Sequence, residues 1–166
     1  MQVPVLATVV YGGLPQPGDW ALRLERLGLD VITTGAQEDR PEGFLAAVAA
    51  VPHRPVLARA GDVAALVQAG ARMIATSDAV PDGTYALGPD DAAIVAVSAD
   101  ARPETADDVG RAVLEAARAG TPSALWVAAP DLSGVPESIV EAKLAALVGG
   151  ARIARLWLAK EQFDHG

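Results

Sequence analysis

The sequence predicts an α/β protein with a mainly parallel sheet, and three observations support this class. Short apolar runs alternate with longer amphipathic segments, which is typical of repeated βα units. Hydrophobic residues make up 51% of the chain, enough to bury a substantial core. The length of 166 residues suits one domain, so we expect residues 1–166 to form a single unit.

Six runs rich in Val, Ile and Ala predict the strands. They are Val3–Val10, Val31–Thr33, Pro55–Ala58, Arg72–Thr76, Ala92–Ser98 and Ala124–Ala128. Each run is short and is bounded by turn-forming Gly, Pro or Asp residues. Residues 80–91 are rich in Pro, Gly and Asp, and this composition predicts a loop.

Helical patterns fill most of the intervals between these strands. The predicted helices begin after a capping Asp19, at Pro41, after Asp62, after Thr105 and near residue 137. Glycines at positions 28, 70 and 120 follow three of them, as expected at helix ends. The helix after Thr105 is predicted to cover residues 106–119, with two aspartates in its first turn.

The last segment allows two interpretations. Residues 153–158 could form a strand. However, apolar residues recur at spacings of three and four from Val140 through Leu144, Leu147, Ala151 and Ala154 to Leu158. This stripe favours one long helix over about residues 137–161, loosened at Gly149-Gly150.

The charge and the absence of cysteine exclude several classes of function. A net charge of −8 does not suit a nucleic-acid-binding face or an anionic membrane surface. A chain without cysteine forms no disulfide, thiol nucleophile or thiolate metal site. There is no apolar run long enough to span a membrane and no basic signal at the start, which fits a cytoplasmic protein.

Several segments resemble, in the same order, the motifs of one enzyme family. Asp30–Gln37, followed by Arg40, resembles the motif DIVTDGEQ with an Arg after it, and Ala69–Asp78 resembles AGAxxIQIDEP. Ala96–Val109 resembles GVVDVKSxxVETxxEV, and Ala124–Gly134 resembles RLWVNPDCGL. Glu141–Leu144 resembles a segment of the final helix. The family is that of the cobalamin-independent methionine synthases, and the similarity is to their C-terminal catalytic barrel. It is more specific over residues 92–152 than over residues 5–80.

The resemblance implies a barrel of the TIM type, but the chain is too short for a complete one. Such a barrel has eight strands and usually about 250 residues, whereas six βα units are predicted here. We therefore expect a contracted or incomplete TIM-like (βα) barrel of about six parallel strands, followed by a long C-terminal helix. The two units that are missing relative to the family would fall between residues 79 and 91.

The resemblance fails at the family's zinc site. Leu132 stands where the motif has its zinc-binding cysteine, and residues 79–91 contain neither His nor Cys. Activation of a homocysteine thiol on zinc needs a preformed set of soft ligands. We therefore predict that zinc-dependent homocysteine methyltransferase activity is absent, and we predict no metal and no cofactor. Whether the protein is an enzyme at all stays open.

Candidate site residues come from the carboxyl ends of the predicted strands, where parallel α/β proteins bind ligands. Tyr11, Asp78 and Asp131 are the candidate acid–base groups, and the candidate ligand-binding residues are Gln37, Arg40, Arg59, Asp100 and Ser133. Other roles are available to the charged groups. The aspartates could instead hold a hard cation or cap helices and turns. The arginines could form surface salt bridges.

Two functions follow as hypotheses. In the first, the strand ends bind a small anionic or amino-acid-like molecule, with a metal-independent transfer or lyase step as a possible extension. In the second, the protein is a non-catalytic binding, regulatory or partner subunit that acts through its C-terminal helix. Open sheet edges would invite pairing with another chain, which makes a homodimer the expected assembly.

Overall fold

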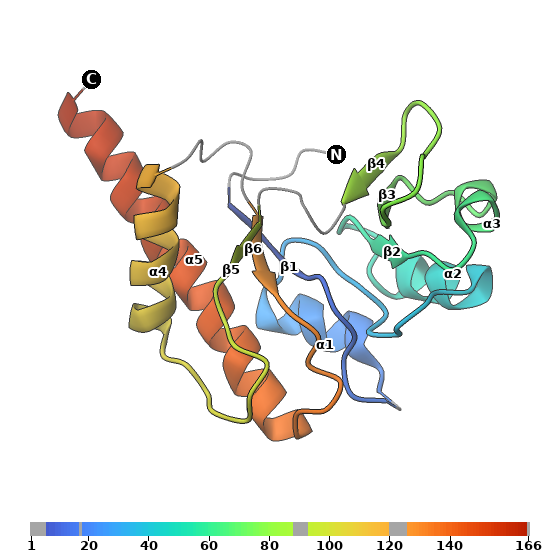
Figure 1. The fold of residues 1–166 in the computed structure, drawn as a ribbon, viewed down its shortest axis with the longest axis horizontal. Helices are drawn as coiled ribbons and strands as arrows, with labels where there is room; N and C mark the ends of the chain where they lie inside the picture. Colours follow the sequence, from blue (N-terminus) through green and yellow to red (C-terminus); the bar gives the residue numbers. More distant parts are fainter. Residues whose placement is uncertain (1–5, 17, 88–92, 120–125, 166) are drawn as a thin grey trace.

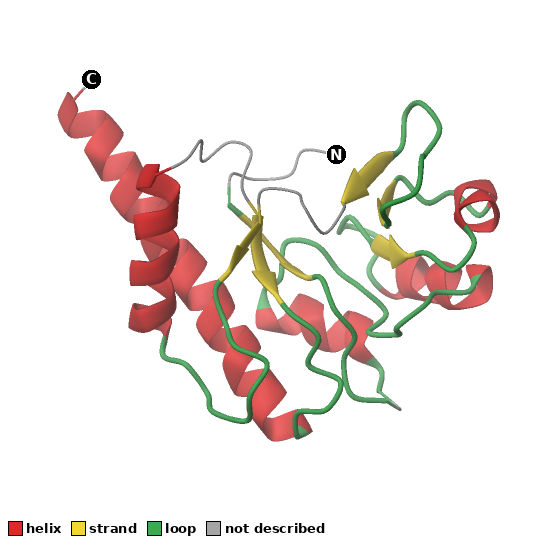
Figure 2. Ribbon diagram, in the orientation of Figure 1, coloured by secondary structure: helices red, strands yellow, loops and turns green. Residues whose placement is uncertain are grey.

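The computed structural model describes residues 6–16, 18–87, 93–119 and 126–165, and Figure 1 draws the remaining residues as a grey trace. The chain has a mixed α/β fold with short parallel strands and a long C-terminal helix. The strands lie in two groups, one at the centre and one towards the upper right, and each group has helices next to it (Figure 2). No helix of the described residues has the length and apolar character needed to cross a membrane.

The elements do not strictly alternate: two helices follow the first strand, and the third, fourth and fifth strands follow one another with no described helix between them. The strands are β1 (Ala7–Val10), β2 (Leu57–Arg59), β3 (Met73–Ala75), β4 (Tyr85–Leu87), β5 (Ala93–Val95) and β6 (Trp126–Ala129). The helices are α1 (Trp20–Leu27), α2 (Pro41–Ala50), α3 (Val63–Gln68), α4 (Ala106–Ala119) and α5 (Glu137–His165). Helices α4 and α5 lie side by side, and α2 and α3 lie beside β2, β3 and β4 (Figure 1).

The strands form two parallel sheets, in the orders β1-β6-β5 and β2-β3-β4. Residues 31–33 connect the two sheets through backbone hydrogen bonds. The Val31 amide donates to the Thr8 carbonyl (3.1 Å), and the Leu57 amide donates to the Ile32 carbonyl (2.8 Å). The predicted strand at 31–33 is therefore reduced to one isolated bridge, between Ile32 and Val56, but it lies between β1 and β2 as predicted.

Alternate residues of the strands pack on opposite faces, as the twofold period of extended chains requires. One face of both sheets contributes to the main core, which it forms with the helices. The other face gathers into a second buried cluster, here called the inner cluster. It consists of Val9, Val31, Leu57, Leu87 and Ala128, with Tyr11, Met73, Ala75 and Trp126 packed against it. Because these residues come from both sheets, the two sheets curve around a shared interior.

The strand pairs do not complete a barrel over the described residues. β4 pairs with β3 and β5 pairs with β6, and no pairing between β4 and β5 is present in this part of the chain. The two sheets nevertheless approach each other, since the ring of Tyr85 on the edge strand β4 lies 6.1 Å from that of Trp126 on the central strand β6. The contracted barrel therefore stays a prediction, while the parallel α/β class is confirmed.

The predictions of a loop over residues 80–91 and of a side-chain cap at Asp19 are both wrong. The predicted loop at 80–91 contains β4, which forms because three residues, Tyr85 to Leu87, complete the edge beside β3. Asp19 precedes α1 without a capping hydrogen bond from its side chain. In contrast, Asp62 and Thr105 cap their helices as predicted, by accepting from the amides of Ala65 and Asp108.

The C-terminal helix settles the ambiguity of the last segment. Residues 153–158 are helical, and α5 continues without a break through Gly149 and Gly150. The glycines allow close packing against α4, because a Cβ at Gly150 would lie 2.4 Å from Cγ1 of Val109. The predicted loosening at this pair is wrong. The predicted strand residues 3–5, 92, 124 and 125 and the predicted stop at Gly120 lie outside the described residues.

A polar contact fixes α5 against the amino-terminal ends of the strands. Asp30 Oδ2 accepts from the Thr8 amide (2.9 Å), from the Thr8 hydroxyl (3.0 Å) and from Arg155 Nη2 (2.6 Å). The same Arg155 nitrogen donates to the Leu6 carbonyl. This contact ties three distant segments together at the end of the sheet opposite to the candidate site.

Candidate functional site

Three polar side chains extend the inner face at the carboxyl ends of neighbouring strands. Tyr11, Thr33 and Arg59 each lie two residues beyond a member of the inner cluster, respectively Val9, Val31 and Leu57. Because side chains alternate along extended chain, all three belong to the inner face. The local sequence of strand followed by polar residue therefore gathers a phenol, a hydroxyl and a guanidinium at one end of the sheet.

The loop after β6 and the segment before α2 bring a second polar group to the same end, next to the loop after β1. The Gln37 amide nitrogen donates to both carboxylate oxygens of Asp131 at 3.2 Å, and the Ser133 amide donates to Asp131 Oδ1 at 2.9 Å. Glycines make this approach possible. A Cβ at Gly12 would lie 2.2 Å from the Asp131 Cα, and one at Gly13 would lie 2.4 Å from the Gln37 amide nitrogen.

Arg59 is held by its backbone and has an unsatisfied side-chain nitrogen. Its amide donates to Asp39 Oδ2 (2.8 Å), and its carbonyl accepts from the Asp39 amide (2.7 Å). Nη1 of Arg59 is buried and finds no hydrogen-bond partner among the described residues. The hydroxyl of Thr33 is also buried and finds no hydrogen-bond partner among the described residues. Buried polar atoms in folded proteins are normally satisfied by protein, by ordered water or by a ligand.

The two carboxyl groups near Arg59 differ in acidity. Burial raises the pKa of Asp39 and outweighs its hydrogen bonds to Thr34 and to the Arg59 amide. Partial burial also acts to raise the pKa of Asp131, but hydrogen bonds from Ser133 and Gln37 and the charge of Arg59 outweigh it, so that pKa is lowered. Asp131 is thus a stable carboxylate, suited to accept hydrogen bonds and unsuited to donate a proton near neutral pH.

Five of the eight predicted site residues lie near one another at the carboxyl ends of the strands: Tyr11, Arg59 and the exposed Gln37, Asp131 and Ser133. The others have different surroundings. Arg40 is exposed as the residue before α2, and Asp78 is exposed in a turn, where its amide donates to the Thr76 hydroxyl. The catalytic role predicted for Asp78 and the binding role predicted for Arg40 have no support in these contacts.

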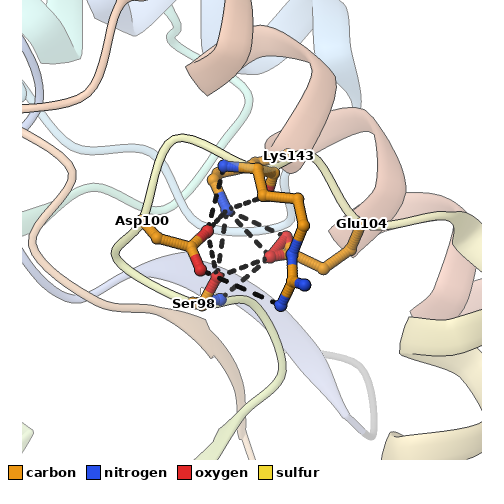
Figure 3. A network of polar contacts seen from close by, with 5 residues as sticks. Ser98, Asp100, Glu104 and Lys143 are labelled. Carbon is orange, nitrogen blue, oxygen red and sulfur yellow. Dashed lines mark hydrogen bonds and ion pairs between the residues drawn. The ribbon is translucent and has the colours of Figure 1, made fainter.

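Asp100 belongs to a separate network centred on Lys143 of α5 (Figure 3). The Lys143 side chain is fully buried, and its ammonium donates to Glu104 (2.8 Å), to the Arg102 carbonyl (2.6 Å) and to Ser98 (3.2 Å). Asp100 lies 3.4 Å from the same nitrogen and accepts from the Ser98 hydroxyl. These contacts hold the loop between β5 and α4 against α5, so they account for Asp100 without a ligand.

Acid should weaken the fold through this network. The Ser98 hydrogen bond, followed by that of the Arg102 amide, lowers the pKa of Asp100 from 3.8 to about 2. Burial acts to raise the pKa of Glu104, but hydrogen bonds from Lys143 and Ser98 outweigh it and lower that pKa below 4.5. Both carboxyls have a lower pKa in the folded than in the unfolded protein. Their contribution to the free energy of unfolding is therefore complete at pH values above the unfolded pKa, and it disappears as pH falls through the folded pKa.

We therefore expect the urea midpoint to fall as pH is lowered from about 4.5 to about 2. The Glu104→Gln variant lacks one of these carboxylates and should show a smaller fall over the same interval. Asp39 acts in the opposite direction, because its pKa is raised on folding. Equal pH dependence of the parent and Glu104→Gln would refute this role for the network.

The residues present do not fit the zinc site that the resemblance implies. Leu132 is fully buried in the main core and offers no ligand atom at the position of the expected cysteine. Within the described ranges no group of three or more His, Cys, Asp or Glu side chains is placed to hold a metal ion. Asp78, Asp100 and Asp131 therefore do not assemble the hard-cation site that their strand-end positions allowed.

Sequence reasoning missed two residues that the structure brings forward. Thr33 lies at the end of a predicted strand, but its lack of a hydrogen-bond partner depends on neighbours distant in sequence. Lys143 had a visible signal, because it falls between Val140 and Leu144 inside the apolar stripe of the last helix. A cation within such a stripe indicates a buried, paired charge.

The fold and these strand ends define a parallel α/β protein. Comparisons with known proteins add little to this assignment. No family model matches the chain, and no curated protein matches it. One similar solved structure is a B12-independent methionine synthase from Shewanella sp. W3-18-1, in complex with selenomethionine, with 18% identity and a TM-score of 0.36. The match covers 84% of this chain and 52% of that one, so the chain spans about half its length. A likeness this weak amounts to a distant relationship at most.

Proposed function

We propose that this protein binds a small anionic molecule at the carboxyl ends of its parallel strands, with Arg59 as the anion-binding group. The observation that carries the proposal is Nη1 of Arg59, which is buried without a hydrogen-bond partner among the described residues. A buried guanidinium donor left unpaired costs free energy, and an oxyanion would satisfy it. The position agrees with the end of the sheet where parallel α/β proteins bind ligands.

The groups beside Arg59 are better suited to orient a ligand than to act as acid or base catalysts. Asp131 is held as a carboxylate by Gln37 and Ser133, so it would accept hydrogen bonds from amino or hydroxyl groups of the ligand. The Tyr11 side chain packs against the inner cluster and would border the same space. Binding is therefore the main proposal. A metal-independent transfer or lyase step would need a proton donor other than Asp131.

The contracted barrel is part of the same proposal. Residues 31–33 link the two sheets, and the inner cluster draws on four strands from both of them. In a curved arrangement of this kind the strand ends converge on one opening, as in complete barrels. The interior below is packed with side chains, which would leave the carboxyl end as the place for a ligand.

Replacing Arg59 by methionine tests the site directly. Methionine keeps an unbranched apolar stem, although a shorter one, and removes every donor. We expect the dissociation constant of an anionic probe to rise at least about tenfold, because a charge-assisted hydrogen bond is lost. The probes are propionate and inorganic phosphate, titrated at constant ionic strength and followed by amide chemical shifts of the residues around Arg59.

Arg111→Met is the matched control, because Arg111 is an exposed arginine on α4, which lies on the other side of the molecule from β2 (Figure 1). This variant should bind the probes as the parent does. Binding that responds equally to both substitutions would indicate nonspecific attraction to the surface. If neither probe shifted the residues around Arg59, the proposed function would be overturned as well.

A partner-binding role is the second candidate, and exposed apolar residues on α5 favour it. Leu156 is 72% exposed and Phe163 is 86% exposed, and Trp157 lies between them with half of its surface exposed. Leu156 and Phe163 are seven residues apart, so they share one face of the helix. A second copy of the chain is the first partner to test.

Sedimentation of the parent and of a Leu156→Glu/Phe163→Glu double variant at tens of micromolar tests self-association. The expected result is a parent heavier than a monomer and a monomeric variant, since two charges would oppose an apolar contact. A monomeric parent would remove the second copy as the partner. Substitution is preferable to deleting residues 153–166, because deletion would also remove Arg155 and its ion pair with Asp30.

A further inference from the structure

Thr33 is a buried threonine whose hydroxyl has no partner within the described part of the chain, although the residue is only 1% exposed. Thr8 provides a direct comparison in the same fold. It is equally buried, but its hydroxyl donates to Asp30 Oδ2 and accepts from the Asp30 amide, both at 3.0 Å. The protein therefore satisfies one buried threonine of the strands and leaves another without a partner. A buried hydroxyl is normally satisfied by protein, water or ligand.

Thr33 and Arg59 lie on adjacent segments and on the same face. The Leu57 amide donates to the Ile32 carbonyl, which places residue 33 directly beside β2. Thr33 follows Val31 by two residues and Arg59 follows Leu57 by two, and both reference residues belong to the inner cluster. The bridge between Ile32 and Val56 sets Thr33 level with Leu57, two residues before Arg59, so both unsatisfied atoms lie towards the carboxyl ends of these two neighbouring segments.

We propose that Thr33 and Arg59 together bind one carboxylate group, so that the ligand of the site is a small monocarboxylate. This inference rests on the proposed function and specifies its ligand class. One carboxylate oxygen would accept from Nη1 of Arg59 and the other from the Thr33 hydroxyl, which satisfies both orphaned atoms at once. No covalent step is involved.

The surrounding charges favour a monoanion over phosphate. The Asp39 carboxyl accepts from the Arg59 amide, and the Asp131 carboxylate interacts electrostatically with Arg59. Two acidic groups therefore already face the single guanidinium. A phosphate group carries close to two negative charges at neutral pH, so it would meet stronger repulsion than a carboxylate does.

The packing below the site favours a short ligand. Val9, Val31 and Leu57 are all fully buried and form a packed layer of the inner cluster, each two residues before Tyr11, Thr33 or Arg59 along its own segment. A carboxylate seated on this layer would direct the rest of the molecule towards the solvent side, where Gln37 and Asp131 lie. Propionate is therefore a suitable probe, because it carries the acid group and little else.

The test compares Thr33→Val with Thr8→Val in titrations with propionate and inorganic phosphate, together with thermal unfolding of each variant. We expect Thr33→Val to raise the propionate dissociation constant about tenfold, the effect of one lost hydrogen bond to a charged group. The same variant should unfold at or above the parent temperature, because it removes an unsatisfied hydroxyl. Thr8→Val should unfold at a lower temperature and keep the parent affinity.

Thr33→Ser retains the hydroxyl and should bind propionate as the parent does, which keeps the test valid if valine disturbs the fold. Phosphate should bind at least about tenfold more weakly than propionate. Loss of binding in Arg59→Met, with Thr33→Val unaffected, would overturn this inference and leave the proposed function standing. Phosphate binding as tight as propionate binding would also overturn it. If Arg59→Met bound propionate as tightly as the parent does, both this inference and the proposed function would be overturned.

Discussion

Replacing Lys143 by methionine is expected to lower the free energy of unfolding by about 3 kcal/mol, the usual order for breaking a buried ion pair. The Lys143 side chain is fully buried, and its ammonium satisfies Glu104, the Ser98 hydroxyl and the Arg102 carbonyl (Figure 3). Methionine fills similar space but donates nothing, so these acceptors lose their partner. Urea denaturation with a two-state fit measures the difference.

Lys160→Met is the matched control, because Lys160 is an exposed lysine on the same helix. Its only described interaction is a contact with the Trp157 ring at 5.2 Å, so we expect a change below about 1 kcal/mol. Adding Glu104→Leu to Lys143→Met should recover part of the loss, since removing both partners leaves no unpaired charge. Equal effects of the two lysine substitutions would show that the network does not stabilise the fold.

Gly150→Ala is expected to be the most disruptive methyl addition in the described helices, at about 2 kcal/mol. The new Cβ would lie 2.4 Å from Val109 Cγ1 and 2.7 Å from the Gly110 amide nitrogen, so α4 and α5 would have to separate. Backbone atoms cannot yield as a flexible side-chain end can. The loss exceeds the gain in helix propensity from replacing a glycine, which is about 1 kcal/mol.

Gly43→Ala is the control for this prediction. Gly43 is a helical glycine in α2, and no described atom lies within 4 Å of the point that an added Cβ would occupy, so the same substitution should stabilise the protein slightly. Gly149→Ala should be intermediate, because its Cβ would lie 3.0 Å from the Ala106 Cβ. Thermal unfolding of the three variants should rank them in the order 43, 149 and 150, from most to least stable. A Gly150→Ala variant as stable as the parent would contradict the tight packing.

The fold could be predicted where local pattern and tertiary environment agree. The apolar runs at β1, β3 and β6 are buried strands, and the stripe from Val140 to Leu158 is one helix, because each pattern matches the face that becomes buried. β4 could not be predicted in this way. Its three residues lie among Pro, Gly and Asp, and they become a strand only because β3 offers a free edge.

The site was partly predictable for a related reason. Selecting the polar residues that follow the predicted strands is enough to find Arg59, Gln37 and Asp131, because parallel strands end at one side of a sheet. It also selects Asp100, although Lys143 pairs with that carboxylate from another element. Which polar atoms are left unsatisfied depends on contacts between distant segments. The role of Thr33 and the partners of Lys143 therefore emerge only from the folded chain.

The most direct test of the anion site is a crystal structure of the protein soaked with propionate. We expect the carboxylate to lie on the inner face at the carboxyl ends of the strands, within about 3.2 Å of Arg59 Nη1 and of the Thr33 hydroxyl. Propionate bound elsewhere, with Arg59 Nη1 satisfied by an ordered protein group instead, would contradict the account.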